Sequence, residues 1–452
     1  MSGKPKRRTQ PKEALGGLGI LVVLVGATVL AGRRLAAWGL PPWAAWLVAL
    51  PCVVAAFLLL VIAVLPLTPR GRRVLGAIAQ LLLREREGAD LAAARQAAGT
   101  QGFVLRVGRV AVWSDRMDGA ARTAAYVAGE VASRFEELLA LSAPPCRKPL
   151  RILCFSAEAA FETYTQGMFV TVGRARGHYS GFWFARIAIC RELAERLPSS
   201  LPATVAHEVT HFLLRASVRR RPPVWLDEGL AETLARRFGP AHRAPGRLAR
   251  WLRAAQARGD LLPAAGLLAL TRRKLARRWQ NWDDLPSVAF VETVYTQSGG
   301  FVAFLAETWP EAFRPFLAAL PCRHRARRVF ARCFGLSPDE AMTRWIDAAT
   351  ADPAPLVPPT DDLKLRIEAE LVQPILSPHA SPDQRRLAIR LMGSLGYAWR
   401  ADALIEILAG PDEPLRAEAR RALECIAGEL RGDAPHDWHP WLTALPRGVA
   451  CD

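Results

Sequence analysis

Two long apolar runs near the N-terminus constrain what this 452-residue chain can fold into more than any other feature of its sequence. Residues 14–32 carry no charge and would form a helix about 28 Å long, and residues 43–65 would form one of about 34 Å. Either length is enough to cross the hydrocarbon core of a bilayer. Because only a short loop, residues 33–42, joins the two runs, we predict a transmembrane helical hairpin within residues 14–75.

The positive charges around the hairpin predict its orientation. Five lysines and arginines lie in residues 1–13 and three arginines lie at 70–73, whereas the joining loop holds two. The positive-inside rule therefore places both ends of the hairpin, and the chain that follows it, in the cytoplasm. Two alternatives stay open. The first run could be a cleaved signal peptide, since it ends in small residues at 29–31, or the hairpin could be inverted.

The chain is strongly basic, with 60 lysines and arginines, 42 acidic residues and a net charge of +18. Arginine-rich runs at 219–221, 272–278 and 323–328 are typical of solvated faces, and the alternatives are contact with an anionic leaflet or with nucleic acid. No nucleic-acid-binding signature accompanies them, so no nucleic-acid partner is predicted. The eight cysteines form no CxxC pair, which excludes a disulfide-dense scaffold and a zinc site made of cysteines.

Beyond the hairpin the sequence alternates between strand-like and helix-like patterns, and from residue 201 onward it is almost wholly helical. This order predicts an α+β fold, with a small sheet followed by a helical half. Upstream of residue 201 we expect strands at 103–113, 150–155 and 182–190, helices at 118–141 and 157–164, and a turn at 177–181.

A proline-rich stretch at 350–359 predicts a linker, which we place at 350–362. Beyond it, the pattern at 385–395 recurs at 416–426, a shift of 31 residues (416 − 385). A period near 30 is typical of α-solenoids, and the segment resembles short HEAT-like repeats that could bind a protein partner. A plain helical bundle is the alternative. The predicted order is a basic N-terminus at 1–13, the hairpin at 14–75, a connector at 76–102, a main domain at 103–349, the linker, the repeats at 363–430 and a tail at 431–452.

The most informative five residues are His207-Glu208-Val209-Thr210-His211. They lie in an apolar-periodic stretch, 201–214, that predicts a helix, so the two histidines, four positions apart, point to one side of it. Neutral imidazole is a good zinc ligand, and a pair at this spacing can bind one ion. Glu208 is then close enough to a water molecule at the metal to act as a general base. An ordinary polar helix face is the alternative.

A second motif, Pro-Pro-Val-Trp-Leu-Asp-Glu-Gly-Leu-Ala-Glu, follows at residues 222–232. The two prolines break the chain and Asp227 can cap a new helix, which puts Glu228 in its first turn as a third metal ligand. The glycine that follows would let two helices approach closely. Glu232, one turn on, can hydrogen-bond a ligating imidazole and fix its tautomer. The alternative for both glutamates is an acidic face with i,i+4 spacing.

Together the two motifs resemble those of the gluzincin metallopeptidases, in which an HExxH helix is followed by a helix that contains Glu-Gly. They are particularly similar to the peptidase-MA-like proteins of bacteria. The likeness extends over roughly residues 103–345 and is strong only at 204–236. It implies a gluzincin-type fold for the main domain, which would then be a zinc metallopeptidase domain.

The resemblance also implies roles for particular residues. His207, His211 and Glu228 would bind Zn²⁺, and Glu208 would be the general base. Tyr295 sits where relatives carry a tyrosine before a helix, and its phenol could donate to the developing oxyanion. A tyrosine packed at the start of a helix is the alternative for that position.

We therefore expect a membrane-anchored, zinc-dependent peptidase that acts on a protein or peptide substrate. No aminopeptidase motif is present, so the resemblance favours an endopeptidase. The hairpin would make it a multi-pass protein of the bacterial inner membrane, with the catalytic domain in the cytoplasm. The alternative is a catalytically inactive metallopeptidase fold that serves as a scaffold or binding protein at the membrane.

Overall fold

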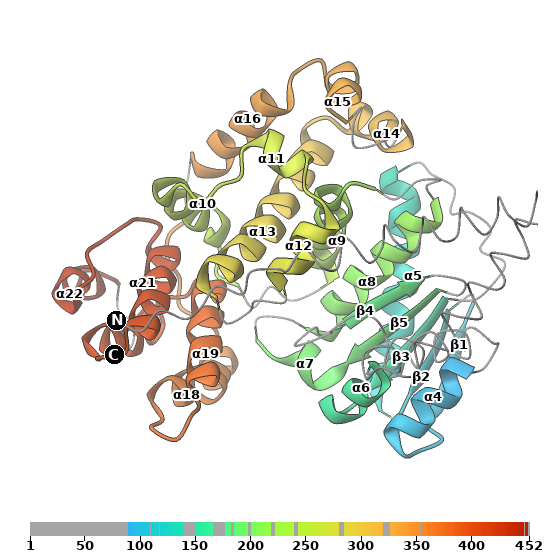
Figure 1. Cartoon of the computed structure of the whole chain (residues 1–452), viewed down its shortest axis with the longest axis horizontal. Helices are drawn as coiled ribbons and strands as arrows, with labels where there is room; N and C mark the ends of the chain where they lie inside the picture. Colours follow the sequence, from blue (N-terminus) through green and yellow to red (C-terminus); the bar gives the residue numbers. More distant parts are fainter. Residues whose placement is uncertain are drawn as a thin grey trace, which may run out of the picture. The chain divides into compact units, whose positions relative to one another are not determined.

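The computed structural model describes most of the chain between residues 89 and 450 (Figure 1). Within that span it leaves out residues 109, 117, 140–149, 166–176, 182–184, 198–199, 218–221, 239–242, 280–283, 320–325, 352–353 and 447.

A five-stranded mixed sheet occupies the first part of the described chain, with the strand order β1-β2-β3-β5-β4. The inner pairs β2–β3 and β3–β5 are parallel, whereas the edge strands β1 and β4 pair antiparallel to β2 and β5. The strands are β1 (Phe103–Val107), β2 (Val110–Ser114), β3 (Leu150–Phe155), β4 (Gly177–Gly181) and β5 (Ala185–Cys190).

Two of the predicted sheet elements need correction. The single strand expected at 103–113 is a hairpin of β1 and β2, because the chain reverses at Gly108, whose φ of 56° lies in the left-handed region that favours glycine. The turn expected at 177–181 is the edge strand β4, which pairs along its length with β5. The strand at 150–155 is confirmed.

Helices cover both faces of the sheet. The helices α5 (Gly119–Leu139) and α8 (Leu201–Ser217) pack together over one face, against a buried layer that includes Val112, Ile152 and Ile187. On the other face, α4 (Ala89–Ala98) and α6 (Glu158–Thr165) contact β3, and aromatic side chains of α6 pack against Phe155. A short helix, α7 (Arg191–Glu195), follows β5. The sheet thus packs against α8, the helix that contains the first motif.

The helical half is built around the pair α9 (Val224–Phe238) and α13 (Leu285–Thr308). Glycine permits their close approach, because a Cβ on Gly229 would lie 2.5 Å from Cγ2 of Val302. Trp225 anchors the pair with ring centroids 6.0 Å from Phe301 and 6.2 Å from Phe316. The surrounding helices are α10 (Arg247–Arg258), α11 (Ala264–Leu268), α12 (Arg272–Trp279), α14 (Pro310–Ala319), α15 (Ala326–Phe334) and α16 (Pro338–Thr350).

The C-terminal helices pack around a second hydrophobic core. Ser381 and Asp412 each cap a helix that has a proline in its first two positions and ends at a glycine with positive φ, and the two caps lie 31 residues apart (412 − 381), the period seen in the sequence. Arg258 of α10 donates to Glu424 at 2.7 Å, so charged contacts join this part to the helical half. The helices are α17 (Asp361–Ile367), the π-helix η3 (Glu368–Val372), α18 (Gln373–Leu376), α19 (Pro382–Leu395), α20 (Ala401–Ala409), α21 (Glu413–Ala427) and α22 (Pro435–Thr443).

The fold class expected from the sequence is corrected by these observations. In the part of the chain that the structure describes, no helix is long and apolar enough to cross a membrane. The described residues form a mostly helical fold with a small mixed sheet, whereas the sequence predicted an α+β fold with a membrane hairpin. Even the 24-residue α13 carries Glu292 and Glu307 and buries its apolar side chains against other helices. The two predicted spans, 14–32 and 43–65, lie outside the described residues.

The predicted domain boundaries stay predictions. All the described residues belong to one compact unit, which comprises residues 87–166 and 170–452. The HEAT-like character of 363–430 likewise stays a prediction. The basic N-terminus at 1–13 and the first part of the connector, 76–88, lie outside the described residues.

Candidate metal centre

The two histidines of the first motif project from the same side of α8. Val205, Ala206 and Val209 on the opposite side are buried against α5 and the sheet, which fixes the helix and leaves His207 and His211 facing α9. The two imidazole ring centroids are 4.8 Å apart and the rings stand nearly perpendicular, at 83°. Their Nε2 atoms approach to 3.1 Å, so both lone pairs can serve one ion.

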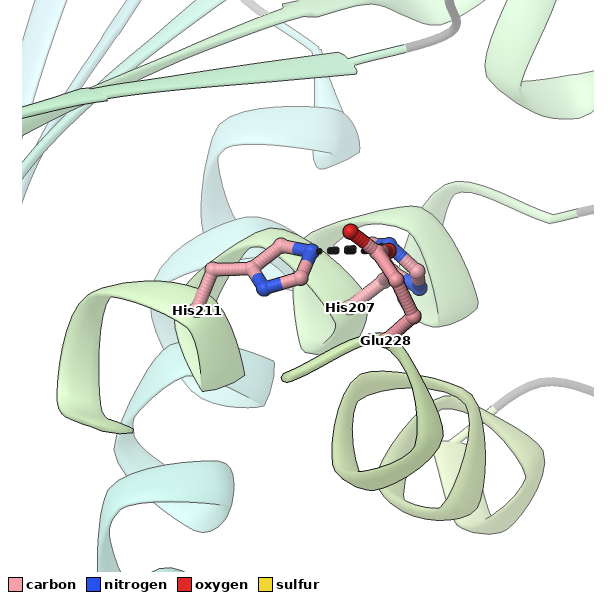
Figure 2. A group of neighbouring side chains, drawn as sticks. All are labelled: His207, His211 and Glu228. Atoms are coloured by element: carbon pink, nitrogen blue, oxygen red, sulfur yellow. Dashed lines mark hydrogen bonds and ion pairs between the residues drawn. The ribbon is translucent and has the colours of Figure 1, made fainter. Parts of the chain in front are cut away.

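Glu228 completes the cluster from α9. This helix begins at Val224, directly after the two prolines, and its apolar face is buried, which turns Glu228 toward α8. The Oε2 atom of Glu228 lies 3.4 Å from Nε2 of His211 and 3.7 Å from Nε2 of His207. Figure 2 shows the three side chains converging, and one ligand atom from each lies within 4.8 Å of the others.

The second nitrogen of each imidazole is held by a carboxylate. Nδ1 of His211 lies 2.7 Å from Oδ1 of Asp227, and Nδ1 of His207 lies 3.3 Å from Oε1 of Glu232. An ionised carboxylate can only accept, so each Nδ1 is the donor, and a neutral imidazole then carries its lone pair on Nε2. Such pairs orient ligating histidines and make them more basic.

The donor atoms of the centre are of the kind that binds a divalent cation. When both imidazoles are neutral, their Nε2 atoms and the carboxylate of Glu228 are all acceptors, and they face one another. Within the described residues, the buried Oε2 atom of Glu228 has no hydrogen-bond partner. A buried acceptor without a donor is costly, and a cation placed among the three would satisfy all of them. Two imidazoles and one carboxylate form a donor set that suits zinc.

The electrostatics of the centre also favour a positive charge there. Burial lowers the pKa of His207, but contacts with Glu228 and Glu232 more than offset it, so its pKa lies well above the usual value. Burial raises the pKa of Glu228, and the two histidines more than reverse this, holding it far below the ordinary range. Without a metal, a proton on His207 therefore supplies the positive charge.

Asp227 has a different place from the one predicted. It was expected to cap α9, but the helix begins three residues earlier, and the backbone N–H of Asp227 already donates to the carbonyl of Pro223 at 3.0 Å. Its side chain is fully buried and, besides His211, forms an ion pair with Arg272 of α12. Arg215 of α8 lies 3.6 Å from the same carboxylate. These two arginines neutralise a buried charge that would otherwise be costly.

Sequence reasoning missed Asp227 and Arg272 as parts of the site. Asp227 could have been noticed because it directly precedes the expected ligand Glu228. Arg272 gave no local signal, since it lies 45 residues from Asp227 in the chain and belongs to a run of arginines.

The two residues expected to act in catalysis both lie next to His207. Glu208 follows it on α8, is 9% exposed, and its negative charge contributes to the raised pKa of His207. Tyr295 projects from α13, and its ring lies 6.3 Å from the His207 ring with the two planes 23° apart. The structure therefore brings Glu208 and Tyr295 to one histidine from two different helices.

Close packing of α9 and α13 holds the acidic residues in place. A Cβ on Gly299 of α13 would lie 2.8 Å from Cβ of Glu232, so the helices meet with no room for a larger residue. The hydroxyl of Thr233 donates to the carbonyl oxygen of Gly229 at 2.7 Å and reaches that of Gly299 at 3.2 Å. The predicted close approach at Gly229 is confirmed, and α13 is its partner.

Comparison of the chain with models of known protein families and with curated proteins finds no match. A function for the chain therefore has to be argued from the residues and geometry of this centre.

Proposed function

We propose that the chain is a zinc-dependent peptidase, with His207, His211 and Glu228 as the zinc ligands and Glu208 as the general base. One observation carries the proposal: three acceptor groups converge while both imidazoles are held from behind by carboxylates. Two histidines that share a helix face by chance would not each be expected to have a carboxylate at Nδ1. Ligating histidines commonly have one, because it fixes the orientation of the ring.

Zinc held there would polarise a carbonyl oxygen and lower the pKa of a water molecule. We assign the proton transfers to Glu208, which directly follows the ligand His207 on α8. In this mechanism the carboxylate of Glu208 accepts a proton from the attacking water and then passes it to the leaving amine. The phenol of Tyr295 donates a hydrogen bond to the oxyanion that develops on the substrate.

The competing function is a catalytically inactive scaffold that keeps only the fold. A scaffold could use a structural metal, but it would not need a base beside the ligands. The presence of Glu208 together with all three ligands and both bracing carboxylates therefore favours the enzyme.

Metal analysis combined with a peptide-hydrolysis assay tests the proposal. The protein should contain one zinc per chain, and its hydrolysis of an unstructured protein such as casein should stop with a chelator and return with added zinc. Glu208→Gln should keep the zinc and lose turnover, whereas Glu162→Gln, at an exposed position on α6, should change neither. Absence of bound zinc would refute the metal centre. Full hydrolysis by Glu208→Gln would refute the base.

A further inference from the structure

The most strongly charged helix in the described structure lies next to the metal centre. The helix α12 has eight residues, of which five are cations and none is acidic. Leu275 holds it against α13, where it packs with Val291 and Val294 in a small hydrophobic cluster. Figure 1 shows α12 close to α9 and α13. The five cations are Arg272, Arg273, Lys274, Arg277 and Arg278.

The first residue of α12 reaches the centre itself. Arg272 forms an ion pair with the buried Asp227, and its Nη1 atom lies 4.0 Å from Oε1 of the ligand Glu228. The helix therefore starts at the edge of the candidate active site.

Two cations of α12 are used within the protein. The ammonium group of Lys274 lies 5.3 Å from the ring centroid of Phe290, and the guanidinium group of Arg278 lies 5.7 Å from the same centroid. Arg278 also donates to the hydroxyl of Ser287 at 3.1 Å. These contacts fix the face of α12 that looks toward α13.

The other two cations are exposed to solvent. Arg273 and Arg277 are exposed, and no residue described by the structure forms a hydrogen bond or ion pair with their side chains. They lie one turn apart, on the same side of the helix and roughly opposite Leu275. The arginine of another exposed helix, Arg344 of α16, by contrast forms an ion pair with Glu340 at 2.7 Å.

We propose that α12 is a docking face for acidic side chains of the substrate, with Arg273 and Arg277 as the residues that bind them. This inference rests on the proposed peptidase function and adds a substrate class to it. From Arg272 to Arg277 the helix advances about 7.5 Å, which an extended peptide covers in about two to three residues. Acidic residues a few positions from the cleaved bond would thus meet both guanidinium groups.

The proposal accounts for the position of the charge as well as its amount. Arginines that only keep the protein soluble, or that bind an anionic bilayer or nucleic acid, would not have to lie near the proposed zinc ligands. A cationic helix tied to the centre through Arg272 raises the local concentration of acidic peptides where they can react. The exposed pair Arg327 and Arg328 on α15 serves as a comparison, since α15 packs on α14 and α16 instead.

A binding experiment tests the docking face independently of hydrolysis. The probe is a fluorescein-labelled peptide with a run of glutamates beside a neutral segment, and its partner carries glutamines in their place. Fluorescence anisotropy is measured on the Glu208→Gln protein, so that the probe stays intact. The glutamate peptide should bind more tightly, and Arg273→Gln/Arg277→Gln should weaken its binding about tenfold and leave the glutamine peptide unchanged.

A variant of α15 serves as the control. Arg327→Gln/Arg328→Gln removes the same charge from α15 and should leave glutamate-peptide binding unchanged. The proposal fails if both peptides bind equally, if the α15 variant loses as much affinity, or if the α12 variant loses binding only to anionic vesicles or to an oligonucleotide. Because the readout is binding, a chain that hydrolyses no peptide refutes the peptidase while this comparison still decides the docking face.

Discussion

The Nδ1 atom of His211 lies 2.7 Å from Oδ1 of Asp227, the residue directly before Glu228. Two adjacent residues of α9 thus hold opposite sides of one imidazole, since Glu228 faces its Nε2 atom. The position of α9 therefore determines the geometry of the centre, because any shift of this helix moves both the ligand Glu228 and the residue that orients His211, Asp227. Arg272 fixes the far side of Asp227 and joins α12 to the same arrangement.

Replacing Asp227 by asparagine should weaken zinc binding. The amide is nearly isosteric but carries no charge, so His211 becomes a poorer ligand and Arg272 loses its ion-pair partner. We expect zinc affinity to fall about 10- to 100-fold, measured by competition with a chromophoric chelator. Asp284→Asn, near the start of α13, serves as the control and should bind zinc normally. Equal affinity in the two variants would contradict a bracing role for Asp227.

Zinc binding should release a proton from His207. Its pKa is raised well above the usual value in the metal-free centre, so the ring is protonated at neutral pH and must lose that proton to become a ligand. Apparent zinc affinity should therefore rise with pH until the raised pKa is passed. In the metal-free protein the effect of pH on folding has the opposite sign. The stabilisation of the folded state by protonated His207 is complete below the pKa of histidine in the unfolded state, and it is lost as pH rises through the raised pKa of the folded state.

Calorimetry in two buffers with different ionisation enthalpies measures the released proton directly. The apparent enthalpy of zinc binding should differ between the buffers, and the difference should shrink in Glu232→Gln, which removes one carboxylate that raises the pKa of His207. Identical enthalpies in both buffers would show that His207 is already neutral.

A methyl group at Gly229 should separate α9 from α13. The new Cβ would lie 2.5 Å from Cγ2 of Val302 and 2.7 Å from the carbonyl oxygen of Ser298, and backbone cannot move aside cheaply. Gly229→Ala should reduce the free energy of unfolding by about 1–3 kcal/mol and weaken zinc binding, because Glu228 is adjacent. Gly129→Ala on α5 meets no atom within 4 Å and should stabilise the fold by about 0.5–1 kcal/mol. Urea titration of both variants checks the contrast.

Removing the hydroxyl of Tyr295 should slow the chemistry and leave the fold intact. Tyr295→Phe keeps the ring that faces His207 but cannot donate to an oxyanion. We expect kcat to fall about 10²-fold or more, with KM and zinc content nearly unchanged. A parallel loss of zinc would instead indicate that the residue only supports His207.

The meeting of His207, His211 and Glu228 could be predicted because it follows from local geometry. Residues four apart share a helix face, and two prolines force a new helix to begin, so few arrangements of the two segments are possible. Their role as zinc ligands stays a prediction. The site of Glu232 beside His207 followed in the same way, since it lies one turn after Glu228 on α9.

Long-range partners could not be predicted in this way. Whether Asp227 caps a helix or braces a ligand depends on where α9 begins, and a shift of three residues decides it. In the sequence Arg272 is one member of a run of arginines, and only the packing of α12 brings it to Asp227. The glycines at 177 and 181 suggest a turn, and only the pairing with β5 makes this segment the edge strand β4.

Asp260 should strengthen the contact between α10 and α21. Its Oδ2 atom accepts from Arg258 at 2.8 Å and from Arg421 of α21 at 2.6 Å, so one carboxylate separates two mostly buried guanidinium groups. Burial raises the pKa of Asp260, but these two arginines lower it by more. Asp260→Asn would leave Arg258 with Glu424 and Arg421 with Glu292 as their remaining acidic partners, and we expect it to reduce the free energy of unfolding by about 1–2 kcal/mol at pH 7.

The pH dependence of that loss checks its cause. Because the folded pKa of Asp260 is depressed, its contribution is present above the unfolded pKa of about 4 and disappears as pH falls through the folded value. Urea titrations of the original protein and Asp260→Asn should therefore differ at neutral pH and converge under acid conditions. Asp383→Asn, which breaks only the exposed pair with Arg386, should cost about 0.5 kcal/mol or less. A difference that persists in acid would mean that the shape of the side chain, and not its charge, joins α10 to α21.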